Sequence, residues 1–217
     1  HYIGFEGGSP EDNFTWTVLG DGYDVGDGKM ATQIKTTVDD PGDERENDID
    51  FWVQEDNGEL YYYGYYEYKS GSEDYPRIAD DQYIVFSDPI LFGTDGMNVG
   101  DEIKDSGSGT VDIKISQFLP AVTVEFSIDS TVTYTDILPE RTTPMGTFTD
   151  ALRVLVNMDL VTEYGTFNFQ NNTFILKEGV GMVVQDQEPD ANDAEIQAID
   201  AGQVGGVAIE PDIPPDS

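Results

Sequence analysis

The stretch DFWVQEDNGELYYYGYYEY, residues Asp50 to Tyr68, decides the fold class. Its centre, Asn57-Gly58, supplies two residues that tolerate positive φ, as a two-residue hairpin turn requires. Aromatic and apolar residues stand on both sides of this turn. Counting outward from it predicts the facing pairs Phe51–Gly64, Val53–Tyr62, Trp52–Tyr63 and Gln54–Tyr61. The stretch therefore predicts an antiparallel β-hairpin.

Strand-period alternation continues through the rest of the chain. Apolar residues occupy every second position from Val122 to Ile128, and the same phase continues at Val132 and Tyr134, which predicts one long strand or a tight hairpin. The same alternation runs from Leu152 to Leu160. A second hairpin is expected at Asn171-Asn172, with the facing pairs Phe169–Phe174 and Phe167–Leu176. Helical periodicity is short and rare. We therefore expect an all-β fold, a curved antiparallel sheet or partial barrel or sandwich with little helix.

The length and composition favour one folded domain. Of the 217 residues, 38% are hydrophobic and 12% aromatic, which is enough apolar surface to bury a core. We expect residues 1–210 to form a single β-rich domain. Residues 211–217 contain three prolines and no apolar periodicity, which predicts a flexible acidic tail.

The charge balance excludes whole classes of partner. Against 44 Asp and Glu stand 10 Lys and Arg, a formal net charge of -34, so the surface repels nucleic acid and anionic lipid headgroups. There is no Cys, and the one histidine is His1. Disulfides, thiolate or histidine metal sites and Ser-His-Asp catalysis are therefore not expected. No apolar run is long enough for a membrane helix.

Calcium is the metal ion that suits this composition, because it takes oxygen ligands and needs neither His nor Cys. Two acidic segments are candidates. Their residues are Asp21, Asp24 and Asp27 in the first, and Asp190, Asp193 and Glu195, with neighbouring acids, in the second. Neither has the spacing of an EF-hand loop. Composition favours the alternative, in which both segments are solvated acidic loops.

The aromatic residues of the first hairpin are the candidate ligand site. In the predicted register Trp52, Tyr61, Tyr63 and Tyr65 share one face of the hairpin, and further rings share the other. A strand with one wet face does not need rings on both sides. The second face could bind an apolar ligand or stack on a carbohydrate, or both faces could be buried in a two-layer core.

Three segments resemble a family of uncharacterised bacterial secreted proteins and lipoproteins. They run from Asp88 to Ile103, from Pro144 to Val154 and from Thr173 to Val183, and the region they span is about half of the chain. The similarity lies in a Gly-Asp-x-aromatic step, a Pro-x-Gly-Thr-Phe-x-x-Ala step and a Gly-Val-Gly-hydrophobic-Val-Lys step. Ile103 and Val184 stand where the family has Trp and Lys. The resemblance implies export and a curved antiparallel sheet, and it implies no catalytic residue.

These observations lead to one expected function and two alternatives. We expect a non-catalytic domain in the periplasm, at the cell surface or in the medium. Its role is either structural or the binding of an apolar or carbohydrate ligand through its aromatic hairpin. A calcium-stabilised adhesion or matrix module is the first alternative. A glycoside hydrolase is the second, because such enzymes need only two carboxylates at a suitable separation, and acidic residues are plentiful here.

Overall fold

The computed structural model describes residues 2–6, 9–38, 48–68, 75–186, 196–199, 203–204 and 207–215. These residues contain strands and turns and no helix, which confirms the predicted all-β class. No described helix could therefore span a membrane. The strands are β1 Tyr2–Glu6, β2 Ser9–Asp24, β3 Met30–Val38, β4 Ile49–Gln54, β5 Leu60–Glu67, β6 Arg77–Ile78, β7 Gln82–Gly93, β8 Glu102–Lys114, β9 Val122–Thr143, β10 Gly146–Thr162, β11 Gly165–Lys177, β12 Gly181–Asp186, β13 Ile196–Ile199, β14 Gln203–Val204 and β15 Val207–Ala208.

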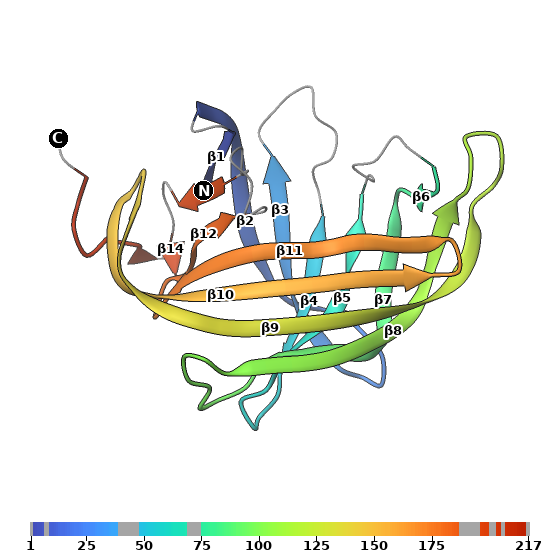
Figure 1. The fold of residues 1–217 in the computed structure, drawn as a ribbon, viewed down its shortest axis with the longest axis horizontal. Coiled ribbons are helices and arrows are strands. Elements are labelled where there is room, and N and C mark those ends of the chain that lie inside the picture. The colour runs from blue at the N-terminus through green and yellow to red at the C-terminus, as the bar shows by residue number, and fades with distance from the viewer. Residues whose placement is uncertain are drawn as a thin grey trace.

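One antiparallel sheet dominates the described residues and curls into a half-barrel. Its thirteen strands follow the order β6-β8-β7-β5-β4-β3-β2-β1-β13-β12-β11-β10-β9, and β8 also pairs with β9. The long strands β9, β10 and β11 cross in front of β3, β4, β5 and β7 (Figure 1). The curl therefore places two parts of one sheet face to face.

The sequences of β9 and β10 alternate between buried and exposed residues along their length. Val124, Phe126, Ile128 and Val132 of β9 are buried, and the intervening Thr123, Glu125, Ser127 and Asp129 are exposed. Val154, Val156, Met158 and Leu160 repeat this pattern on β10. One face of each strand is thus in the core and one in water. Of the two forms expected for Val122–Tyr134, the structure has the single long strand.

The second predicted hairpin is wrong. Asn171 and Asn172 lie inside the continuous strand β11, where they face Asn157 and Val156 of β10. The chain turns instead between Thr162 and Gly165, which are the last facing pair of β10 and β11. The long pairing with β10 outweighs the local turn preference of two asparagines, because each further residue pair adds contacts that a short hairpin would forfeit.

The first predicted hairpin forms, with a different turn. Gly58 N donates to the Glu55 carbonyl, Glu55 N donates to the Glu59 carbonyl, and Gly58 has φ +85°. This is a three-residue loop with glycine in the left-handed position, not the expected two-residue turn. Near the turn the facing pairs are consequently Gln54–Leu60, Val53–Tyr61 and Trp52–Tyr62.

A β-bulge restores the predicted register further from the turn. The pairing shifts by one residue between Phe51 and Trp52, and Tyr63 is the extra residue on β5. Phe51 therefore faces Gly64 as expected, whereas the predicted Val53–Tyr62, Trp52–Tyr63 and Gln54–Tyr61 pairs are wrong. The bulge also places Tyr65 and Tyr66 on the faces opposite to those that the predicted register gives them.

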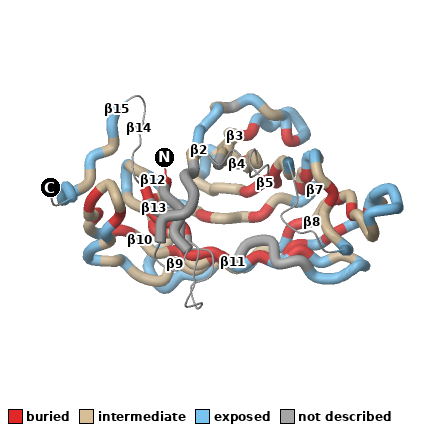
Figure 2. The backbone as a smooth tube through the Cα atoms, turned by 90° about the horizontal axis from the view of Figure 1, so that it is seen from above, coloured by how far each residue is buried: buried red, intermediate tan, exposed pale blue. Residues whose placement is uncertain are grey.

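The described buried residues, red in Figure 2, form three hydrophobic clusters. The largest fills the inside of the curl, where side chains of β5, β7 and β8 meet those of β9 and β10. A second gathers around Phe148, Val183 and Ile199. A third, made by β2, β3, β4, β5, β7 and Val25 of the β2–β3 loop, lies on the other face of these strands around Phe51. Strands β4 and β5 are thus covered by aromatic side chains on both faces.

The C-terminal segment docks on the sheet and is not a loose tail over its described part. Ile213 and Thr147 exchange two backbone hydrogen bonds of 2.8 and 3.0 Å. The Asp212 carboxylate accepts from Thr149 N at 2.7 Å and pairs with Lys177 at 3.0 Å, and these partners lower the pKa of Asp212. The flexible tail predicted for 211–217 is therefore wrong for residues 211–213; residues 216–217 lie outside the described residues.

Candidate functional site

The structure divides the four aromatic residues predicted to share one face. Trp52 and Tyr65 belong to the cluster inside the curl, and Tyr65 is 6% exposed. The Trp52 ring lies 4.7 Å from that of Tyr62 and 4.9 Å from that of Phe92. Tyr61 and Tyr63 belong to the cluster around Phe51. The predicted common face is therefore wrong, because the three-residue turn places Trp52 opposite Tyr62 and the bulge at Tyr63 turns Tyr65 to the other face.

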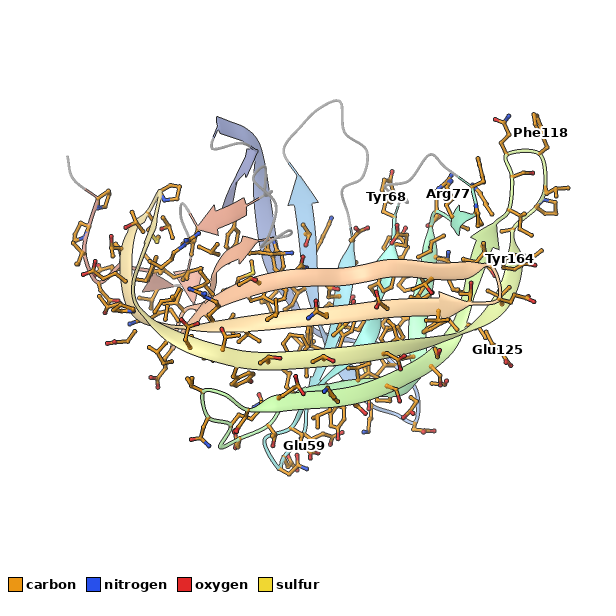
Figure 3. The ribbon with its side chains drawn as sticks, viewed as in Figure 1. Glu59, Tyr68, Arg77, Phe118, Glu125 and Tyr164 are labelled. Carbon is orange, nitrogen blue, oxygen red and sulfur yellow. The ribbon has the colours of Figure 1, made fainter. Side chains whose placement is uncertain are left out.

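Tyr61 and Tyr63 line a hollow of about 710 Å³ at the β4–β5 turn. We call this space the carboxylate hollow. Its walls come from the β2–β3 loop, the β4–β5 turn and strands β5, β7 and β8. The lining residues are Lys29, Glu55, Asp56, Asn57, Glu59, Tyr61, Tyr63, Asp88, Pro89 and Asp105. Glu59 marks this end of the molecule in Figure 3.

The hollow lies where β7 and β8 separate. Their facing pairs are Phe86–Gly109 and Asp88–Ser108, with an irregularity between them. Further along, the Asp105 carboxylate accepts a hydrogen bond of 2.7 Å from Leu91 N. A side chain thus takes the place of a neighbouring strand and satisfies the backbone donor. Because β7 and β8 separate here, the carboxylates of Asp88 and Asp105 both line the hollow.

Lys29 is the one cationic residue among those that line the hollow. Its ammonium pairs with the Glu55 carboxylate and donates to the Tyr63 hydroxyl at 3.0 Å. The hydrogen bonds to Glu55 and Tyr63 raise the pKa of Lys29. Five carboxylates and one ammonium leave the lining with a net charge of about -4 at neutral pH. The hollow is therefore rich in hydrogen-bond acceptors.

Hydrogen bonds within the turn hold the Tyr61 ring. The Tyr61 hydroxyl donates to Glu59 Oε2 at 3.0 Å, and the Asn57 amide donates to the same oxygen at 2.8 Å. The bond to Glu59 is the main cause of a raised pKa of Tyr61. Glu59 N in turn donates to Asn57 Oδ1 at 3.1 Å. The turn thus presents a fixed aromatic ring beside fixed carboxylates.

A second group of carboxyls lies at the other end of β4 and β5. Burial raises the pKa of Asp50 to about 6, although Asp50 accepts a hydrogen bond of 2.7 Å from the Tyr62 hydroxyl. Burial and the nearby Asp48 and Asp80 carboxylates raise the pKa of Glu67 to about 7. Tyr68 and Arg77 mark this end in Figure 3, away from Glu59. These carboxyls therefore lie apart from the hollow.

The predicted calcium residues remain largely untested. Asp24 and Asp27 are in the β2–β3 region, where Asp24 Oδ1 accepts from Gly26 N at 2.9 Å. Asp21 is on β2, and its side chain is outside the described part of the structure. Asp190, Asp193 and Glu195 also lie outside the described residues. Among the side chains that are described, no three acidic or histidine residues gather closely enough to hold a metal ion.

Removal of divalent ions tests the calcium alternative. We expect excess EDTA, added at constant ionic strength, to leave the melting temperature unchanged, because carboxylates that are merely solvated lose nothing when calcium is removed. Thermal unfolding followed by circular dichroism measures this. A fall in melting temperature that added calcium reverses would show that the acidic segments hold the ion.

The sequence pattern missed most of the hollow. Tyr61 and Tyr63 were predicted as ligand residues, but Lys29, Asp88 and Asp105 come from segments far away in the chain. Within the hairpin itself, the adjacent acids Glu55 and Asp56 indicate that carboxylates lie near these tyrosines. Comparison of the chain with models of protein families, with curated proteins and with solved structures gives no match. The resemblance to secreted bacterial proteins therefore stays a prediction.

Proposed function

We propose that this chain is a non-catalytic, exported binding domain that holds a neutral carbohydrate in the carboxylate hollow. One observation carries the proposal: Tyr61 and Tyr63 line the same hollow of about 710 Å³ as five carboxylates. Fixed aromatic rings beside convergent polar groups are typical of small-molecule sites. Export rests on the resemblance of three segments to secreted bacterial proteins.

The chemistry of the lining favours a ligand with many hydroxyl groups. A carboxylate accepts hydrogen bonds and donates none, so its partner must supply O–H or N–H groups. Sugar hydroxyls do so, and hydrogen bonds to a charged acceptor are stronger than neutral ones. The faces of tyrosine rings suit the C–H faces of a pyranose ring. In the hollow the half-buried Tyr61 brings such a ring beside the carboxylates, whereas the Tyr63 ring is buried with the Lys29 ammonium 5.6 Å from its centre.

The same lining disfavours the other ligand classes. A net charge of about -4 around the hollow, on a chain with a formal charge of -34, repels anionic glycans and phosphates. An apolar ligand would strip water from carboxylates and give no hydrogen bonds in return. A neutral polyol is not repelled, and its hydroxyl groups replace the hydrogen bonds that the carboxylates lose with water. We therefore narrow the expected ligand from apolar or carbohydrate to neutral carbohydrate.

Retention on immobilised polysaccharides tests this function. We expect the chain to bind at least one of glucan, mannan, galactan and xylan, and to ignore the polyanions alginate and heparin. In the Tyr61→Ala variant the affinity for the retained polysaccharide is expected to fall about tenfold, the effect of losing one well-placed aromatic contact. Isothermal titration calorimetry with soluble fragments measures the dissociation constant.

Matched variants separate binding from folding. Tyr61→Phe keeps the ring, and Tyr164→Ala removes an exposed tyrosine at the β10–β11 turn (Figure 3). Tyr164→Ala is expected to bind as the parent chain does. Tyr61→Phe, which loses the hydrogen bond to Glu59, is expected to bind more weakly than the parent chain and more tightly than Tyr61→Ala. All three variants are expected to have similar melting temperatures. Retention of none of the neutral polysaccharides, or equal binding by Tyr61→Ala and the parent chain, would refute the proposal.

A further inference from the structure

A set of aromatic rings continues from the hollow along the outer face of the sheet. We call Tyr23, Phe51, Tyr66 and Tyr83 the tyrosine strip. The Tyr23 ring stacks on Phe51 at 4.4 Å and on Tyr83 at 5.1 Å, with interplanar angles of 17° and 4°. The Tyr66 and Tyr83 rings lie 4.6 Å apart. Residues from β2, β4, β5 and β7 thus form one continuous aromatic surface.

Tyr83 is the exposed ring of the strip, and the other rings are half-buried or buried. Tyr83 keeps 53% of its surface exposed, although it touches three other rings. The Tyr66 hydroxyl donates to Asp81 Oδ1 at 2.6 Å, and this bond is the main cause of a raised pKa of Tyr66. Phe51, at 0% exposed, forms the floor. An aromatic surface rimmed by carboxylates is pre-organised for binding, because the rings lose little freedom when a ligand arrives.

The strip and the hollow share one hydrophobic cluster. Tyr61, Tyr63 and Tyr66 all pack against the cluster around Phe51 and all come from β5. At the usual rise of a strand, Tyr61 and Tyr66 are separated by about 15 Å along the sheet. This is longer than one sugar ring. A ligand confined to the hollow would leave Tyr83 uncovered.

We propose that the ligand is a linear polysaccharide chain that runs along β5 from the carboxylate hollow to Tyr83. This inference rests on the proposed function and adds to it the class of ligand, a polymer and not a free monosaccharide. Successive sugar units would stack on the exposed rings and donate hydroxyls to the carboxylates beside them, such as Glu59 at one end and Asp81 at the other. The negative surface selects a neutral polymer.

The dependence of affinity on chain length tests the inference. The probes are oligomers of the neutral polysaccharide that the parent chain retains most strongly, from the disaccharide upward. We expect affinity to rise with each added unit until the oligomer reaches Tyr83, and then to level off. In Tyr83→Ala the longest oligomers are expected to bind about fivefold to tenfold more weakly, and the disaccharide to bind unchanged.

Two controls keep the outcomes distinct. Tyr83→Phe, which keeps the ring, is expected to retain the full length dependence, and Tyr164→Ala removes an equally polar ring elsewhere. Affinity that is flat with length in the parent chain, or a length dependence that survives in a folded Tyr83→Ala, overturns the polymer inference and leaves the hollow as the binding site. If no neutral oligosaccharide binds at all, the proposed function fails and this inference falls with it.

Discussion

Replacing Gly64 by alanine is expected to destabilise the protein by about 3 kcal/mol or more. Gly64 has φ +125°, and an added Cβ would overlap the carbonyl oxygen of Ile84 and lie 3.1 Å from the Cα of Val85. These are backbone atoms of the neighbouring strand β7, so no rotamer change relieves the overlap. Gly64 also faces Phe51, which is fully buried. The substitution therefore forces β5 and β7 apart beside the core.

A second glycine separates steric overlap from backbone strain. Gly26 has a similar φ of +113°, and nothing lies within 4 Å of an added Cβ. Gly26→Ala is expected to lower the free energy of unfolding by about 1 kcal/mol, because alanine disfavours this backbone conformation even where no atom clashes. Chemical unfolding of both variants measures the difference. Equal losses of unfolding free energy would show that the close approach of β5 and β7 is not the cause.

Replacing Glu67 by glutamine is expected to stabilise the protein at about pH 8 by about 2 kcal/mol and to have almost no effect near pH 4. Burial, with Asp48 and Asp80 nearby and only partly offset by Arg77, raises the pKa of Glu67 from 4.5 to about 7. The folded chain therefore binds the Glu67 proton more tightly than the unfolded chain. Stability contributed by the protonated form is complete below pH 4.5 and is lost as the pH rises through 7.

The measurement is urea unfolding of both proteins across this pH range. Because any lost negative charge stabilises a chain with a formal charge of -34, Glu125→Gln serves as the reference. Glu125 is exposed on β9 and points away from the body in Figure 3. Asp50→Asn, which keeps an oxygen for the Tyr62 hydroxyl, is expected to follow Glu67→Gln over a lower pH window, because the pKa of Asp50 is raised to about 6. If Glu67→Gln and Glu125→Gln gain the same unfolding free energy at every pH, the raised pKa of Glu67 is not the cause.

The strand pattern predicted the fold well where the alternation was long. Val124 to Val132 and Val154 to Leu160 are buried at every second residue, as their spacing indicates. The pattern failed where a local turn preference competed with distant pairing. Asn171-Asn172 is a good turn sequence, yet β11 continues straight through it and pairs with eleven residues of β10 on both sides of this dipeptide. Only the three-dimensional pairing decides between these alternatives.

The candidate site was predicted in part, for a related reason. The predicted register puts Trp52, Tyr61, Tyr63 and Tyr65 on one face. Only Tyr61 and Tyr63 line the hollow, because the three-residue turn moves Trp52 and the bulge moves Tyr65 to the other face. A bulge of one residue carries no reliable signal in a single sequence, and it redirects every side chain beyond it. Lys29, Asp88 and Asp105 join the hollow through loop geometry and through the separation of β7 and β8, which no local spacing encodes.

Pairing of β1 with β13 sets a limit on when this chain can finish folding. Tyr2 faces Ile199, so the two sides of that ladder are synthesised at opposite ends of the described chain. Contacts of such large sequence separation form slowly and cannot exist until residue 199 has left the ribosome. The ladder between β1 and β13 is consequently among the last parts of the sheet to close, after the hairpins of neighbouring strands have been synthesised.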